Sequence, residues 1–152
     1  MTVSLRRVLC ATMLALAALF HAPAWAAELE PLAIETADGG TLKFDVEVMR
    51  TDADRMRGLM FRRDLPPDRG MLFEFPGKEP IQMWMKNTYL PLDMIFFRDG
   101  RVLSIAENTE PLSERIVSSA GNATQVIEVN AGTAQRLKIK VGDRLIFPVA
   151  KH

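Results

Sequence analysis

The sequence predicts a mostly β fold: a small single-domain β-barrel-like fold with two short helices. Three observations support this prediction. Apolar residues alternate with polar ones along most of the chain, turn signals separate the alternating runs, and only two segments show helical spacing. Closing the sheet into a barrel would remove the exposed strand edges that favour aggregation in a protein of 152 residues.

Turn signals place neighbouring strands in hairpins. Residues 37–40 read Ala-Asp-Gly-Gly and precede a run of strict apolar and polar alternation, while Asp99-Gly100 is the strongest hairpin signal in the chain. The alternating or apolar runs beside these and other turns are expected to be strands. The expected strands are Leu32–Thr36, Leu42–Val48, Gly70–Phe75, Ile81–Lys86, Leu92–Arg98, Arg101–Ala106, Thr124–Val129 and Arg144–Phe147.

Two segments are expected to be helical. The first begins after Thr51, whose hydroxyl can cap it, and extends to the arginines at 62–63, which suit the negative end of the helix dipole. The second is short, from Ala131 to about Leu137, with Asn130 as its cap. On the first helix an apolar stripe is expected to face the core, formed by Ala53, Met56, Leu59 and Met60.

Residues 1–26 have the pattern of a cleaved secretory signal peptide. Arg6 and Arg7 precede an apolar run from Val8 to Phe20, and the triplet at 24–26 reads Ala-Trp-Ala, which predicts cleavage after Ala26. The apolar run is shorter than the ~20 residues that a spanning helix needs, so no membrane span is expected after cleavage. We expect a periplasmic or secreted protein, with residues 27–152 forming one domain.

Cleavage at this point changes the composition. The chain has 19 basic and 19 acidic side chains, and loss of Arg6 and Arg7 leaves 17 basic against 19 acidic, a net charge of −2. The single cysteine, Cys10, and one of the two histidines, His21, are also lost, so only His152 remains. Thiol catalysis, disulfides, Cys/His zinc sites and a Ser/His/Asp triad are therefore excluded from the exported domain. We expect no nucleic-acid partner, no cofactor and a monomer.

The segment from Gln82 to Met94 carries the most unusual chemistry. On a strand, Trp84 and Lys86 would share one face, where the indole offers a surface for stacking. Asn87 and Thr88 could donate hydrogen bonds, and Asp93 could accept one. The sequence therefore favours a small-ligand or glycan-binding module, with a small molecule or cell-envelope glycan as partner, over an enzyme. The expected ligand-binding residues are Trp84, Lys86, Asn87, Thr88, Asp93 and Glu107.

Two alternatives remain open at this stage. Asp93 and Glu107 could act as a carboxylate pair in a hydrolase-like enzyme, although Asp93 more simply satisfies backbone donors near the Pro91 turn. Met83 and Met85 could bind Cu(I), because thioether sulfur suits a soft cation, although methionines at this spacing more simply pack a core. The arginines between 55 and 69 alternate with aspartates, which favours a salt-bridged surface over an anion site.

Several short motifs, taken together, are similar to those of one family. In order along the chain these are Arg57-Gly58-Leu59-Met60-Phe61-Arg62, Gly70-Met71-Leu72-Phe73, Met83-Trp84-Met85-Lys86-Asn87-Thr88, Pro91-Leu92-Asp93-Met94 and Val141-Gly142-Asp143. They closely resemble the domain of unknown function 192, a family of small, often exported bacterial and archaeal proteins, over about 42–147. The resemblance implies a small β-barrel-like single domain, usually preceded by a signal peptide. It implies no activity.

Overall fold

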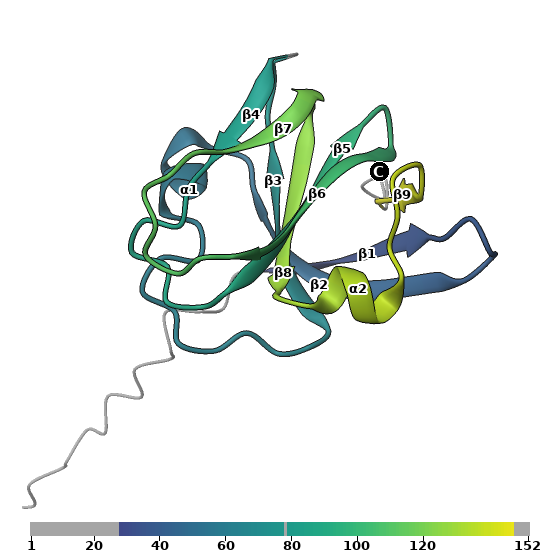
Figure 1. Ribbon diagram of the computed structural model, residues 1–152, viewed down its shortest axis with the longest axis horizontal. Coiled ribbons are helices and arrows are strands. Elements are labelled where there is room, and N and C mark those ends of the chain that lie inside the picture. The colour runs from purple at the N-terminus through teal and green to yellow at the C-terminus, as the bar shows by residue number, and fades with distance from the viewer. Residues whose placement is uncertain (1–27, 78, 148–152) are drawn as a thin grey trace, which may run out of the picture.

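The computed structural model describes residues 28–77 and 79–147 and shows a closed seven-stranded barrel with two short helices (Figure 1). The strands follow one another around the barrel in the order β1, β2, β3, β8, β5, β6, β9, and β4 pairs with β7 in a separate two-stranded sheet. The predicted fold class is thus confirmed. The strands are β1 (Leu29–Glu35), β2 (Thr41–Met49), β3 (Arg69–Glu74), β4 (Pro80–Met83), β5 (Leu92–Arg98), β6 (Arg101–Thr109), β7 (Val117–Asn122), β8 (Gln125–Asn130) and β9 (Arg144–Ile146).

One strand pair in the barrel is parallel and determines where the chain must cross over. β1–β2 and β5–β6 are antiparallel hairpins around the two turns that the sequence marked, whereas β2 and β3 run parallel, with Asp45 opposite Arg69. Parallel neighbours need a long connection between them. Residues 50–68, which include the helix α1 (Asp52–Arg57), form that connection, and we call it the crossover.

Strands β3, β8 and β5 are buried on both faces. Leu72, Ile127 and Ile95 point into the barrel core, while Phe73, Val126 and other neighbours point outward into a second apolar cluster. This second cluster also includes Leu59 from the crossover and residues of β4. These three strands therefore read as nearly continuous apolar runs, because both of their faces are covered.

The helices are shorter than the sequence predicted. Thr51 caps α1 as expected, its hydroxyl accepting a hydrogen bond from the amide of Asp54 at 3.1 Å. The helix ends at Arg57 because Gly58 takes a positive φ of 45°. Met56 is 70 % exposed and no residue of α1 is buried, so the predicted apolar stripe is wrong and only Leu59, beyond the helix, reaches the core.

The second helix starts two residues later than predicted. It is α2 (Thr133–Leu137), and Gly132, with φ 79°, occupies the cap position that the sequence assigned to Asn130. The amide of Asn130 instead donates to the backbone carbonyl of Leu65 at 2.8 Å. This side chain therefore ties the end of β8 to the crossover.

The strand prediction fails at two places. The strand expected over Ile81–Lys86 ends at Met83, because beyond it the backbone amide of Met85 donates to Ser113 and Asn87 adopts φ 55°. β7 was not predicted, since its sequence, Val-Ser-Ser-Ala-Gly-Asn, is poor in strand-forming residues.

Some sequence predictions lie outside the described residues. The leader at 1–26, its cleavage point and His152 belong to this group. Within the described residues, neither helix has the length or the apolar character to cross a membrane.

Candidate functional site

The crossover borders two hollows on the outer side of the barrel. We call the larger one the Arg62 pocket; its volume is about 490 Å³, within the ~300–1,000 Å³ range of small-molecule sites. We call the smaller one the Glu128 pocket; its volume is about 20 Å³, room for roughly one water molecule or ion. The Arg62 pocket is lined by Glu47, Phe61, Arg62, Arg63, Asp64, Leu65, Pro66 and Arg69.

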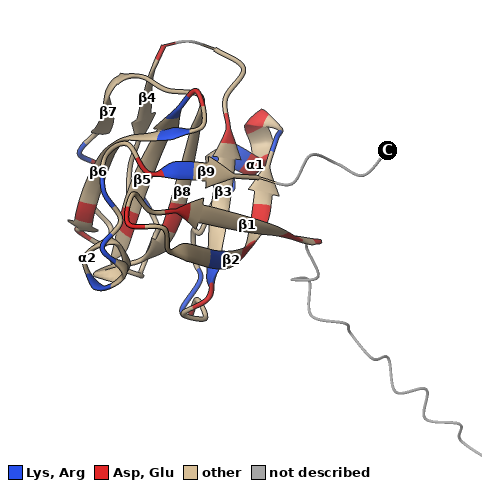
Figure 2. Ribbon diagram, turned by 90° about the vertical axis from the view of Figure 1, so that its right-hand side faces the viewer, with Lys and Arg blue, Asp and Glu red and all other residues tan. Residues whose placement is uncertain are grey.

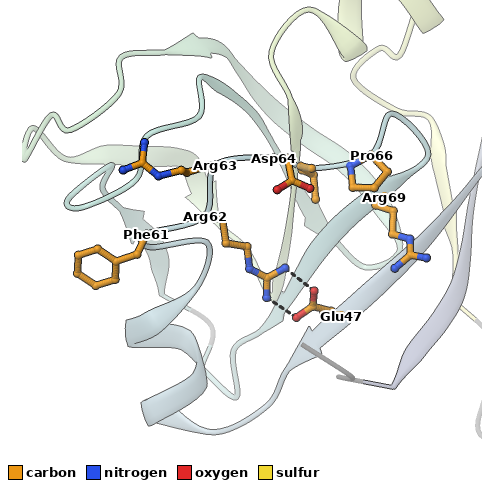
Figure 3. A pocket seen from close by; sticks show the side chains of 8 residues that line it. Glu47, Phe61, Arg62, Arg63, Asp64, Pro66 and Arg69 are labelled. Atoms are coloured by element: carbon orange, nitrogen blue, oxygen red, sulfur yellow. Dashed lines mark hydrogen bonds and ion pairs between the residues drawn. The ribbon is translucent and has the colours of Figure 1, made fainter. Parts of the chain in front are cut away.

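An ion pair between Arg62 and Glu47 lies at the centre of the Arg62 pocket (Figure 3). Both guanidinium amino groups of Arg62 donate to the carboxylate of Glu47, with Nη2 2.5 Å from Oε2. Their side chains are only 15 % and 13 % exposed. A bidentate pair shielded in this way fixes both side chains and gives the pocket a rigid polar wall.

Further arginines and an aromatic ring surround this pair. Phe61 and Arg63 lie on one side of it and Arg69 lies on the other (Figure 3). The Phe61 ring packs edge-on against Tyr89, with centroids 6.4 Å apart, and the Arg63 guanidinium lies 5.1 Å from the Tyr89 centroid. Among the described residues, neither Arg63 nor Arg69 has an acidic partner within ion-pair distance. The pocket therefore combines an apolar edge with two cations that are available to an anion.

The Glu128 pocket contains an acidic side chain in an apolar setting. Glu128 lies on β8 between Met71 of β3 and Met94 of β5, and it is only 4 % exposed. Burial raises the pKa of Glu128 to about 8 from an ordinary value of 4.5. At neutral pH this carboxyl is therefore largely protonated. The pocket is lined by residues 55–60 of the crossover together with Phe73, Met83, Trp84, Lys86, Thr88 and Glu128.

Three of the predicted ligand-binding residues meet at the Glu128 pocket. Trp84, Lys86 and Thr88 line it, with Trp84 38 % exposed and the ammonium of Lys86 5.1 Å from the centroid of its ring. Asn87 lies next to them and joins the loop to the crossover: its carbonyl accepts from the amide of Phe61 at 2.8 Å and its side-chain amide contacts the sulfur of Met60 at 3.8 Å.

The other two predicted ligand-binding residues do not line either pocket. Asp93 is completely buried, and its carboxylate accepts hydrogen bonds from the backbone amides of Asn108, Gly132 and Ala134. Glu107 is exposed on β6. Asp93 therefore has the structural role that the sequence offered as its simpler interpretation, and its carboxylate faces backbone donors and not either pocket.

Only one of the two predicted metal-binding methionines lines the Glu128 pocket. Met83 lines the Glu128 pocket. Met85 is 1 % exposed, lies away from that lining, and its sulfur is contacted by the hydroxyl of Thr109 at 3.2 Å. Their side chains share a buried side as alternation predicted, while Trp84 between them is exposed.

Sequence reasoning missed the central residue of each pocket. Glu47 alternates with apolar residues on β2 and so reads as a solvent-facing strand residue. Glu128 is the one acid in the apolar run from Val126 to Val129. This position could have indicated a site, since an acid within such a run must be paired or have a shifted pKa. The expected salt-bridged arginine surface is found in part, because Arg55 pairs with Asp52 as Arg62 does with Glu47.

The fold and the two hollows define a class of protein, a small β-barrel domain whose parallel crossover carries accessible pockets. The chain belongs to the family named domain of unknown function 192 (DUF192), described as "Uncharacterized ACR", which matches residues 33–147. The resemblance seen in the sequence motifs is thereby confirmed.

Two solved structures are similar over most of their length. One, from Sinorhizobium meliloti 1021, is 47 % identical with a TM-score of 0.76 and covers 78 % of this chain and 93 % of its own; its description proposes a transcription regulator. The other, a protein of unknown function from Novosphingobium aromaticivorans DSM 12444, is 37 % identical with a TM-score of 0.78 and covers 83 % and 90 %. A comparison with curated proteins found no significant match.

Proposed function

We propose that this protein is an exported small-ligand-binding module that holds an acidic small molecule in the Arg62 pocket. The observation that supports this proposal is a hollow of about 490 Å³ built around the fixed Arg62–Glu47 pair. Arg63 and Arg69 line the same pocket, and neither has an acidic partner within ion-pair distance among the described residues. A carboxylate or phosphate group is the ligand chemistry that arginine recognises best, through planar, paired hydrogen bonds.

The apolar edge of the pocket narrows the ligand class further. Phe61 is largely exposed, and it is held in place by its contact with Tyr89. Leu65 and Pro66 complete an apolar part of the lining. An acidic ring compound, such as a uronic acid or sugar phosphate of the kind found in cell-envelope glycans, would place its ring on the apolar part of the lining beside Pro66 and its charge near Arg69.

The alternatives have less support. A hydrolase that uses Asp93 and Glu107 would lack one accessible carboxylate, because Asp93 is completely buried. The proposed transcription regulator from Sinorhizobium meliloti would suggest DNA binding. Basic and acidic residues are, however, interspersed over the ribbon (Figure 2), and the full sequence has no excess of basic side chains, with 19 of each sign. DNA binding normally requires a basic surface, so we do not propose it here.

A thermal-shift experiment tests ligand binding. The full chain is melted with glucuronate and with glucose 6-phosphate, and with glucose as the neutral control. We expect the two acidic compounds to raise the melting temperature, since a ligand at ~100 times its Kd adds about 2.7 kcal/mol to the free energy of unfolding. Arg69→Gln should abolish the shift, while Arg98→Gln, on the far hairpin, should preserve it.

Two results would contradict the proposal. One is the absence of a shift with either acidic compound. The other is an equal shift in the wild type and in Arg69→Gln, which would locate binding elsewhere.

Export is a separate proposal that rests on the leader pattern alone. Expression of the full chain in a Gram-negative host, followed by fractionation, should recover the protein in the periplasm with Ala27 as its first residue. Recovery in the cytoplasm with Met1 retained would contradict it.

A further inference from the structure

We propose that the Glu128 pocket binds a soft monovalent cation of the Cu(I) class, held by the thioethers of Met60 and Met83 and the carboxyl group of Glu128. This site differs from the predicted Met83 and Met85 pair, and it is independent of ligand binding in the Arg62 pocket. Three features carry the proposal: which side chains border the pocket, how large the pocket is, and how its charges are arranged.

The fold concentrates thioethers around one carboxyl group. Met56, Met60 and Met83 line the pocket, coming from the crossover and from β4. Directly beside Glu128 on the neighbouring strands lie two more methionines, Met71 and Met94. Soft thioether sulfur favours Cu(I) or Ag(I) over hard divalent cations. This pocket therefore brings together thioethers, the ligand type that a soft cation prefers, and a carboxyl group. An apolar core alone would not require an acid at this position.

The size of the pocket suits an ion. Its volume of about 20 Å³ admits one water-sized particle and no organic ring. The contact between the side-chain amide of Asn87 and the sulfur of Met60 holds that thioether against the loop that contributes Trp84, Lys86 and Thr88 to the same pocket. The donor groups thus border a small space with a fixed wall.

Charge selects a monovalent cation. A bound cation would replace the proton that Glu128 holds at neutral pH, and the resulting carboxylate contributes one negative charge at a site where the residue is 4 % exposed. A monovalent cation bound to it leaves a neutral buried complex, whereas a divalent cation leaves a net positive charge in an environment where uncompensated charge is costly.

Two of the three positive side chains around the pocket, those of Arg55 and Lys86, are directed to other partners. Arg55 pairs with Asp52 and donates to the backbone carbonyls of Arg50 and Glu74. The ammonium of Lys86 lies 3.7 Å from Glu114 and over the Trp84 ring. Arg57 is exposed at the end of α1. The first two are thus compensated, which lowers the repulsion that an entering cation would meet.

Isothermal titration with Ag(I), a redox-stable member of this class, tests the site. The full chain is used in a background with Cys10→Ser, His21→Ala and His152→Ala, because thiol and imidazole groups would compete for silver. We expect one saturable Ag(I) per chain, with affinity falling about 10-fold or more in Met60→Leu, Met83→Leu and Glu128→Gln. Met49→Leu, which removes a thioether outside the pocket lining, is the matched control and should leave the affinity unchanged.

Folding and the Arg62 pocket are controlled separately. Leucine has nearly the volume of methionine, so each Met→Leu variant should keep a melting temperature close to that of the background, which a melting curve checks. Arg69→Gln should bind Ag(I) normally even if acidic ligands fail to bind.

Three results would overturn the metal site. The first is no saturable binding by the background protein. The second is an equal loss of affinity in Met49→Leu and Met83→Leu. The third is Zn²⁺ binding as tightly as Ag(I) and in competition with it.

Discussion

The carboxylate of Asp93 accepts a hydrogen bond from the backbone amide of Ala134 at 2.8 Å and thereby fixes the start of α2 against β5. The same carboxylate accepts from Gly132 at 3.1 Å and from Asn108 at 2.9 Å. One completely buried acid thus satisfies three backbone donors from two separate parts of the chain. The role of Asp93 is to join these segments.

Asp93→Asn should therefore lower the stability of the protein and leave its ligand binding unchanged. An amide retains one acceptor oxygen and places an NH₂ donor against backbone donors, which should lower the free energy of unfolding by about 1–3 kcal/mol. Urea unfolding measures the loss, and thermal shifts with glucuronate and titration with Ag(I) measure binding. Full stability combined with lost binding would show that Asp93 contacts a ligand after all.

Glu128 should make stability depend on pH. Below its unfolded pKa of 4.5 both states hold the proton; between 4.5 and about 8 the unfolded chain releases it and the folded chain keeps it. The unfolding free energy should therefore fall as pH rises through this window, by a few kcal/mol in order of magnitude, since each pKa unit corresponds to about 1.4 kcal/mol. Above pH 8 this contribution should level off.

Glu128→Gln isolates the effect. In urea unfolding with a chelator present, the variant should lack the decline between pH 4.5 and 8 and should gain on the wild type as pH rises. Glu107→Gln removes an exposed acid and should keep the wild-type profile. If Glu128→Gln and the wild type showed parallel profiles, the carboxyl of Glu128 would have an ordinary pKa.

The Arg62–Glu47 pair supplies a further prediction. Glu47→Gln leaves a largely shielded guanidinium without its carboxylate, so the free energy of unfolding should fall by about 1–3 kcal/mol, less than for a completely buried pair. Adding Arg62→Met should recover part of the loss, because the shielded positive charge is then removed as well. A double-mutant cycle by urea unfolding gives the coupling; a value near zero would mean that the pair behaves as an exposed surface contact.

The sequence predicted the barrel better than its helices because local signals set the strands and hairpins. Asp99-Gly100 and alternation on β2 act within a few residues, and both appear where expected. β7 depends on contacts that are distant in sequence: it pairs with β4, and the hydroxyl of Ser119 accepts from the amide of Ile81. No local pattern carries that information.

The candidate sites were harder to predict for the same reason. Trp84, Lys86 and Thr88 lie within five consecutive residues, and the sequence placed them in one site. Glu47 and Arg62 meet only because β2 and β3 are parallel and the crossover folds back over them. Glu128, Met60 and Met83 border one pocket only because β8 lies near the crossover and β4 in the folded chain. Contacts of this kind depend on the order in which strands pair. The spacing of apolar residues along the sequence does not determine that order.

Close approach of β3 to β8 gives the last prediction. A Cβ atom at Gly70 would lie 2.8 Å from the backbone carbonyl of Glu128 and 3.1 Å from a methyl group of Val129. Gly70→Ala should therefore push the two strands apart and cost about 1–3 kcal/mol of unfolding free energy. The shift should also disturb the Glu128 pocket and weaken Ag(I) binding.

Gly77→Ala is the control. At Gly77 a new Cβ atom has no neighbour nearer than 3.9 Å, so this variant should change stability by less than about 0.5 kcal/mol. Equal stability of the two variants in urea unfolding would show that β8 yields to the added methyl group without cost.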